Sequence, residues 1–269
     1  MIRINTKRAT ACIVSAATVL IISACLLPSP EPAKSQDDAM LMALLWQQKS
    51  AEYRALVYQS FNIARMILDR ELNIPCEQKK AVIVDIDETV LDTSPYHAKA
   101  ITDNQQYPAG WEEWCSRASA MEVPGAGDFL RNAVAKGFDV FYVSNRSERI
   151  KEQTIENLKK LGFPQADVNH VLLRNETPSK QSRREQIKKT HRIVLLIGDN
   201  LNDFSEDFED KSIRDRFTET NRLKSRFGKQ FIVLPNPIYG DWERALYRYQ
   251  TNIPAHQKKR FRMNQLESD

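Results

Sequence analysis

Residues 81–89 read AVIVDIDET, so four apolar residues run directly into two aspartates that are one residue apart. A short apolar run stopped by acids predicts a buried parallel strand whose carboxyl end opens into a site. Ligands bind at that edge in open α/β sheets. There Asp85 could attack phosphorus, while Asp87 could protonate the leaving oxygen and later activate water. The alternative for this pair alone is a strand that ends in a solvated acidic turn.

A second expected strand, residues 138–143, is also followed by polar residues. Ser144 and Asn145 offer a hydroxyl and an amide, which suit the oxygens of a phosphoryl group. Two roles remain open for Arg146, namely contact with a substrate and pairing with an acid of the same cleft.

Two more segments supply acids and a lysine. Asp199 and Asp203 follow an apolar run at 193–197 and lie four apart, so both can face one metal if Asp199 caps a helix. Lys180 comes early in a helical pattern, where the helix dipole disfavours a cation unless it meets an anion. Because two carboxylates would repel a phosphate dianion, we expect Mg²⁺, a hard cation, to mediate between them.

These four motifs, in this order, resemble those of the haloacid dehalogenase (HAD) superfamily of aspartate-nucleophile phosphotransferases. Residues 85–96 (DIDETVLDTSPY) and 198–203 (GDNLND) are similar to the class C acid phosphatases, or lipoprotein e(P4) family of 5'-nucleotidases. The resemblance implies a nucleophile and metal ligand in Asp85, an acid/base and carbonyl metal ligand in Asp87, phosphoryl ligands in Ser144, Asn145 and Lys180, and further metal ligands in Asp199 and Asp203.

The resemblance also implies a substrate, a nucleoside or nicotinamide 5'-monophosphate whose ring stacks on aromatic side chains. Tyr239 follows the last expected strand, residues 231–234, and Tyr96 follows the catalytic loop, so we expect both to stack through their ring faces. Trp111 and Trp114 are further candidates, with packing inside a cap as their alternative role.

The alternation of strands and helices predicts an α/β fold with a doubly wound, mainly parallel, HAD-like sheet. Residues 38–72 have helical periodicity and predict an N-terminal helical extension. The aromatic-rich interval 90–123 interrupts the alternation, and we expect a small helical cap there. Residues 38–269 then form one phosphatase domain, with helices expected at 125–136, 148–161, 179–190 and 213–227.

The N-terminus, residues 1–24, has a basic start and an apolar core of signal-peptide length. The motif ISAC ends at Cys25 and resembles a bacterial lipobox, which predicts a lipid-anchored mature chain; ordinary cleavage after Ala24 is the alternative. Leu26 replaces the aspartate that retains lipoproteins at the inner membrane, so we expect the outer membrane of the bacterial envelope. Residues 25–37 are rich in proline and predict a tether.

The net charge and the cysteines give little further information about function. The formal charge is +4, and three of the basic residues lie in the segment expected to be removed, so a nucleic acid polymer is not expected as a partner. A basic cluster at 258–262 is interpreted as a solvated tail or as weakly attracted to anionic surfaces. The sequence does not show whether Cys76 and Cys115 form a disulfide.

The prediction is a Mg²⁺-dependent acid phosphatase of the cell envelope that hydrolyses small phosphomonoesters, mononucleotides above all, through an aspartyl phosphate. Its partners are those substrates and, through the lipid, the membrane; the oligomeric state stays open, a homodimer included. Two alternatives remain, namely an acid phosphatase without base preference, and a surface lipoprotein that binds haem or a host partner.

Overall fold

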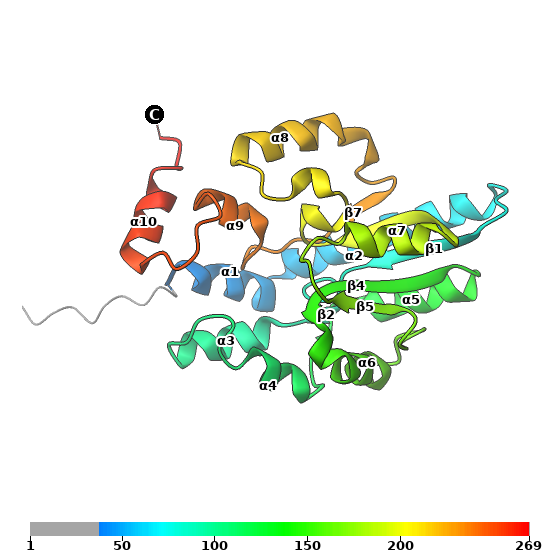
Figure 1. Ribbon diagram of the computed structural model, residues 1–269, viewed down its shortest axis with the longest axis horizontal. Helices are drawn as coiled ribbons and strands as arrows, with labels where there is room; N and C mark the ends of the chain where they lie inside the picture. Colours follow the sequence, from blue (N-terminus) through cyan, green and yellow to red (C-terminus); the bar gives the residue numbers. More distant parts are fainter. Residues whose placement is uncertain (1–37, 269) are drawn as a thin grey trace, which may run out of the picture. The chain divides into compact units, whose positions relative to one another are not determined.

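A five-stranded parallel sheet forms the centre of the described residues, 38–268, in this computed structural model (Figure 1). Its order is β5–β4–β1–β6–β7, with β1 in the middle. The acids that follow β1 therefore emerge at the centre of the carboxyl edge. The strands are β1 Lys79–Val84, β4 Asp139–Ser147, β5 Val171–Arg174, β6 His191–Gly198 and β7 Phe231–Val233.

The apolar run of β1 is continuous because both faces of the sheet are covered. Val82 and Val84 pack into one hydrophobic cluster, and Ala81 and Ile83 pack into another on the opposite face. The first cluster contains residues of α2 (Ala51–Leu72), α5 (Ala126–Ala135) and α6 (Lys151–Lys160), and the second contains residues of α7 (Gln181–Lys188) and of the 3₁₀ turn η3 (Glu206–Phe208). The predicted doubly wound sheet is confirmed.

The N-terminal helical segment is a helix pair, α1 (Asp38–Lys49) and α2. Ser50 divides the two helices, because its hydroxyl caps α2 by accepting a 3.0 Å hydrogen bond from the backbone N–H of Tyr53. Val57 and Phe61 of α2 are buried in the main core, and α2 contacts both β6 and β7. The predicted extension is thus helical, yet α2 is an integral layer of the domain.

The interval 90–123 interrupts the βα alternation, as predicted. It contains α3 (Ser94–Thr102) and α4 (Trp111–Ser116), and a short antiparallel pair, β2 (Leu91–Asp92) with β3 (Met121–Glu122), closes its base. The helical cap is confirmed. The sequence did not predict the pair, since two-residue strands show no periodicity.

Three elements of the remaining chain differ from the predictions. Strand β5 was not among the strands expected from the sequence. The last expected helix is α8 (Ile213–Arg222), followed by the turn η4 (Lys224–Arg226). The interpretation of the C-terminal basic cluster as a tail was wrong, because it belongs to helix α10 (Ala255–Met263), which follows α9 (Asp241–Leu246). Arg262 of α10 donates to the Tyr247 hydroxyl (2.6 Å) and to Glu243 (2.8 Å), and these bonds hold the helix.

Several predictions fall on residues outside the described ones, namely the signal peptide at 1–24, the lipidated Cys25 and the tether at 25–37. Cys76 is exposed and Cys115 is buried, and both are free thiols in the described part of the chain.

Candidate active site

The loop after β1 is a compact turn that presents two acids. The backbone N–H of Asp85 donates to the carbonyl of Ile197 (2.9 Å), which ties the loop to β6. The carbonyl of the fully buried Ile86 accepts hydrogen bonds from the N–H groups of Val90 (2.9 Å) and Leu91 (2.8 Å). The apolar residue between the acids thus anchors the turn, and Asp85 and Asp87 point away from the core.

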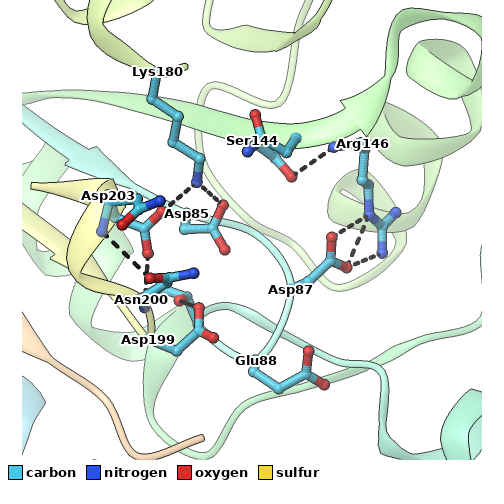
Figure 2. A network of polar contacts seen from close by, with 12 residues as sticks. Asp85, Asp87, Glu88, Ser144, Arg146, Lys180, Asp199, Asn200 and Asp203 are labelled. Atoms are coloured by element: carbon cyan, nitrogen blue, oxygen red, sulfur yellow. Dashed lines mark hydrogen bonds and ion pairs between the residues drawn. The ribbon is translucent and has the colours of Figure 1, made fainter. Parts of the chain in front are cut away.

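Lys180 lies between two carboxylates, as Figure 2 shows. It is the N-cap residue of α7, and only 5% of its surface is exposed. Its ammonium group donates to Oδ1 of Asp85 and lies 2.6 Å from Oδ1 of Asp203. The cation at the start of this helix does meet anions, and its role as a phosphoryl ligand stays a prediction.

Three carboxylates form a cluster that could hold a metal. Asp85, Asp199 and Asp203 each offer an oxygen, and these oxygens lie within 4.8 Å of one another. Asp199 accepts hydrogen bonds from Thr89 Oγ1 (3.2 Å) and Asn236 Nδ2 (2.8 Å), which orient it. A cluster of hard oxygen ligands fits a divalent cation such as Mg²⁺ or Mn²⁺.

A capping box brings the two acids of the GDNLND motif together. Asn200, one residue after Asp199, caps the 3₁₀ turn η2 (Leu201–Asp203) in a capping box with Asp203. Within the box, the Asn200 backbone N–H donates to Oδ2 of Asp203 (3.0 Å). Asn200, and not Asp199, is the cap residue, and the turn still brings both acids to one place.

Burial and mutual repulsion govern the charges of this cluster. Burial raises the pKa of Asp85 to about 7, with Asp203 and Asp87 adding to the shift and Lys180 opposing it. Burial, followed by repulsion from Asp203 and Asp85, raises the pKa of Asp199 well above its usual value. One lysine does not balance these carboxylates, so a divalent cation among them would favour their ionised forms.

Asp87 is held by Arg146. The guanidinium donates to Oδ1 of Asp87 through Nε (3.0 Å) and Nη2 (2.8 Å), and Arg146 is buried at the end of β4 (Figure 2). Its Nη1 donates to Thr154 Oγ1 (3.2 Å), and the group lies 5.6 Å from the ring of Trp111. Of the two roles left open for Arg146, pairing with an acid of the cleft is the one observed.

Ser144 and Asn145 line the same cavity as Asp85 and Asp87. Arg183 of α7 fixes this segment, because it donates to the Ser144 carbonyl (2.5 Å) and to Oδ1 of Asn145 (2.7 Å). The structure therefore brings the predicted phosphate-binding residues together with Asp85, and it adds Arg183 as their support.

The four aromatic candidates divide into two pairs. Tyr239 and Trp111 line the cavity, which has a volume of about 820 Å³. Tyr96 and Trp114 do not appear in its lining within residues 38–268. Tyr96 is buried, its hydroxyl donates to the Ala109 carbonyl (3.0 Å), and its ring packs 4.9 Å from Trp111 and 6.0 Å from Trp114. Tyr96 and Trp114 thus form the cap core behind Trp111.

Comparison with known proteins agrees with this geometry. The family model described as HAD superfamily, subfamily IIIB (Acid phosphatase), matches residues 29–242. The chain belongs to this family.

A class C acid phosphatase from Bacillus anthracis superimposes with a TM-score of 0.85 and 42% identity, covering 87% of this chain and 99% of that one. The same kind of phosphatase from that organism with tungstate bound gives a TM-score of 0.83 and 41% identity, over 87% and 98% of the two chains. Acid phosphatase 1 of Solanum lycopersicum is 25% identical over 58% of this chain, and vegetative storage protein 1 of Arabidopsis thaliana is 27% identical over 58%. The chain spans only 57% and 54% of those two plant proteins.

One buried residue of this subfamily IIIB site was not found from the sequence. Glu88 follows Asp87 in a left-handed conformation (φ 55°), with its carboxylate fully buried. It accepts hydrogen bonds from the N–H (3.0 Å) and hydroxyl of Thr93 and from the hydroxyl of Tyr239. Burial raises its pKa to about 8, with Asp87 adding to the shift. No sequence signal distinguishes such a buried acid from a solvated one at this position.

His97 is a second residue without an assigned role. It lines the cavity, and its ring lies 4.9 Å from the ring of Tyr239. Burial lowers its pKa to about 4, against the opposing effect of Asp87 and Asp92. The imidazole is therefore neutral near pH 7 and supports the tyrosine by packing.

Proposed function

We propose that this protein is a Mg²⁺-dependent phosphatase that hydrolyses nucleoside or nicotinamide 5'-monophosphates. The observation that carries the proposal is the convergence, at the carboxyl edge of β1, of Asp85 with Lys180 and the acids of the GDNLND motif. A nucleophilic carboxylate, a phosphate-binding cation and a candidate metal cluster then surround one point. Tungstate, a tetrahedral oxyanion, is bound in one of the similar class C phosphatases, which agrees with an oxyanion site here.

The chemistry follows from the two acids of the loop. Oδ of Asp85 attacks phosphorus while Asp87 gives a proton to the leaving oxygen, so the alcohol departs uncharged. Asp87, now a carboxylate, takes a proton from a water that attacks the aspartyl phosphate, which releases phosphate and restores Asp85. Arg146 orients Asp87 between these steps, since two of its nitrogens hold one oxygen.

The oxygens of the reacting phosphoryl group are negatively charged, so positive and polar groups must surround them. Lys180 supplies one charge, and Ser144 and Asn145 supply polar contacts along the same wall. Mg²⁺ held by Asp85, Asp199, Asp203 and the Asp87 carbonyl would supply the rest, offsetting the repulsion between these carboxylates and the substrate.

Support for a nucleotide comes from the cavity. Tyr239 and Trp111 both reach its surface, and it is larger than a phosphate group alone requires. A base that stacks on either ring would gain roughly 1–3 kcal/mol. Hydrolysis removes the phosphate dianion, and a cell takes up the resulting nucleoside more easily than the nucleotide.

A panel of phosphomonoesters tests the proposal. We expect turnover to require Mg²⁺, to stop with a chelator, and to be lost in Asp85→Asn, which is nearly isosteric. Adenosine monophosphate and nicotinamide mononucleotide should exceed glycerol phosphate in kcat/KM. More than a few percent activity in Asp85→Asn refutes the mechanism, whereas equal kcat/KM values leave an acid phosphatase without base preference.

We also propose that Cys25 carries a lipid that anchors the enzyme at the outer membrane. The support is the motif ISAC after a signal-like segment. Within residues 38–268 there is no helix long and apolar enough to cross a membrane. Expression with labelled palmitate in a Gram-negative host should label the protein, and Cys25→Ser should abolish this; persistent label contradicts the assignment. Sedimentation of the full chain in solution tests whether it forms a homodimer.

A further inference from the structure

The C-terminal basic cluster reaches the active-site cavity. Lys258 and Arg262 lie four residues apart on α10, hence on one face of the helix, and both line the cavity that contains Asp85. Both cations lie over the ring of Tyr247, at 5.5 and 5.7 Å from its centroid. The neighbouring Lys259 is exposed and does not line the cavity. Lys258 and Arg262 of this helix therefore line the same cavity as Asp85 and Asp87.

The cavity is longer than the catalytic centre. Beyond Tyr239 its wall continues along α9 and α10 and includes Trp242, whose indole donates to the Tyr239 carbonyl (3.2 Å). Trp242 is 45% exposed, which is unusual for so large an apolar side chain. A substrate held at Asp85 and flanked by Tyr239 therefore meets a further wall that has both an exposed ring and cationic groups.

The part of the cavity wall that α9 and α10 form is called the outer wall below. Its positive and negative charges do not cancel. Arg262 is paired with Glu243 at 2.8 Å, and Arg244 is paired with Asp241 at 2.8 Å. Lys258 makes no ion pair with any residue in the described part of the chain, and its ammonium group has only the face of Tyr247. One positive charge is thus left over in a cavity whose inner end binds an anion.

We propose that this outer wall is a second anion subsite, which receives a further phosphate or carboxylate carried by the leaving group of the substrate. Lys258 provides the charge, Arg262 flanks it, and Trp242 covers the apolar part of the ligand. The substrate class is then a nucleoside 5'-phosphate that bears a second anionic group, of which a nucleoside 3',5'-bisphosphate is the simplest example. This inference rests on the proposed nucleotide activity and extends it outward from the reacting phosphate.

The test compares adenosine 5'-monophosphate with adenosine 3',5'-bisphosphate. Loss of the 5'-phosphate is monitored by chromatography of the products. We expect kcat/KM to favour the bisphosphate by about two- to fivefold at low salt, because the added contact is a partly exposed ion pair. The preference should decline as salt rises. Release of 3'-AMP, with the 3'-phosphate retained, is the expected product.

Substitutions in α10 test whether Lys258 causes the preference for the bisphosphate. Lys258→Ala should remove the preference for the bisphosphate and leave turnover of the monophosphate unchanged, and Lys258→Glu should reverse it. Lys259→Ala, a matched change on the exposed side of the same helix, should behave as the unaltered enzyme. A bisphosphate preference that survives in Lys258→Ala, or that is absent from the unaltered enzyme, overturns the inference. The proposed function fails by another result, namely adenosine monophosphate being hydrolysed no better than glycerol phosphate.

Discussion

Replacing Tyr239 with phenylalanine separates its hydroxyl from its ring. The ring face, which the sequence marks as the base-stacking group, is retained. The hydroxyl, which donates to the carboxylate of Glu88, is lost. If the tyrosine acts only by stacking, the variant should be nearly normal. If its hydroxyl also holds the catalytic loop, both stability and turnover should fall.

The magnitude follows from the burial of Glu88. Its carboxylate is fully buried and has two other donors, the N–H and the hydroxyl of Thr93. A buried polar group that loses a partner costs about 1–3 kcal/mol. For a domain of this size that corresponds to a Tm lower by roughly 2–12 °C. Should the whole cost appear in the transition state, kcat falls by about 5- to 150-fold.

The assay uses p-nitrophenyl phosphate and adenosine monophosphate in parallel, with Tm measured by circular dichroism. We expect kcat to fall by the same factor on both substrates in Tyr239→Phe, because the loop serves both and the stacking ring is intact. Tyr247→Phe is the control, since it removes a buried hydroxyl that donates to Glu243 (2.9 Å) far along the chain from the loop. It should lower Tm and leave kcat unaltered. A Tyr239→Phe enzyme with full kcat and full Tm refutes the argument.

Other predictions concern the acids. Asp199→Asn should raise the Tm of the metal-free protein, because it removes a buried carboxylate repelled by its neighbours, and it should abolish the rise in Tm on adding Mg²⁺; an undiminished Mg²⁺ effect contradicts the metal cluster. Asp87→Asn should lose about 10²–10⁴-fold in kcat on ribose phosphates and less on an aryl phosphate, and equal losses would make Asp87 structural. Asp139 is buried, which alone would raise its pKa, but hydrogen bonds from Lys79, Gln165 and His191 lower it to about 2. Its contribution is therefore present above pH 4 and lost as the pH falls toward 2, so urea unfolding should show the destabilisation by Asp139→Asn shrinking over that range.

The sequence predicted those parts of the site that are determined by residues close together in the chain. Asp85 and Asp87 follow a buried strand, and their placement at a sheet edge needs only the βα alternation. Lys180 was found because a cation at a helix start needs an anion, and the structure supplies two. Such patterns are set by neighbours in the chain, and the sequence records neighbours directly.

The parts that escaped prediction depend on distant contacts. Tyr239 and Glu88 are 151 residues apart, and Arg183 reaches Asn145 across 38 residues. An acid or an arginine in an α/β protein is usually solvated, so composition alone does not single these out. Helix α10 was missed because polar contacts hold it in place of a hydrophobic stripe.

The catalytic loop shows why stability and activity are linked in this enzyme. Each polar residue of the loop at 85–89 is fixed by a different element of the fold, and the apolar one is buried in the core. The contacts are Asp85 with Lys180, Asp87 with Arg146, Glu88 with Tyr239, and Thr89 with Asp199. Four separate segments of the chain contact these five residues. The contacts offset the free-energy cost of holding the like charges of Asp85 and Asp87 close together. Loss of the Arg146 contact or of the Tyr239 contact should therefore weaken both the fold and the chemistry, whereas a change on the outer wall of the cavity should affect only which substrate is preferred.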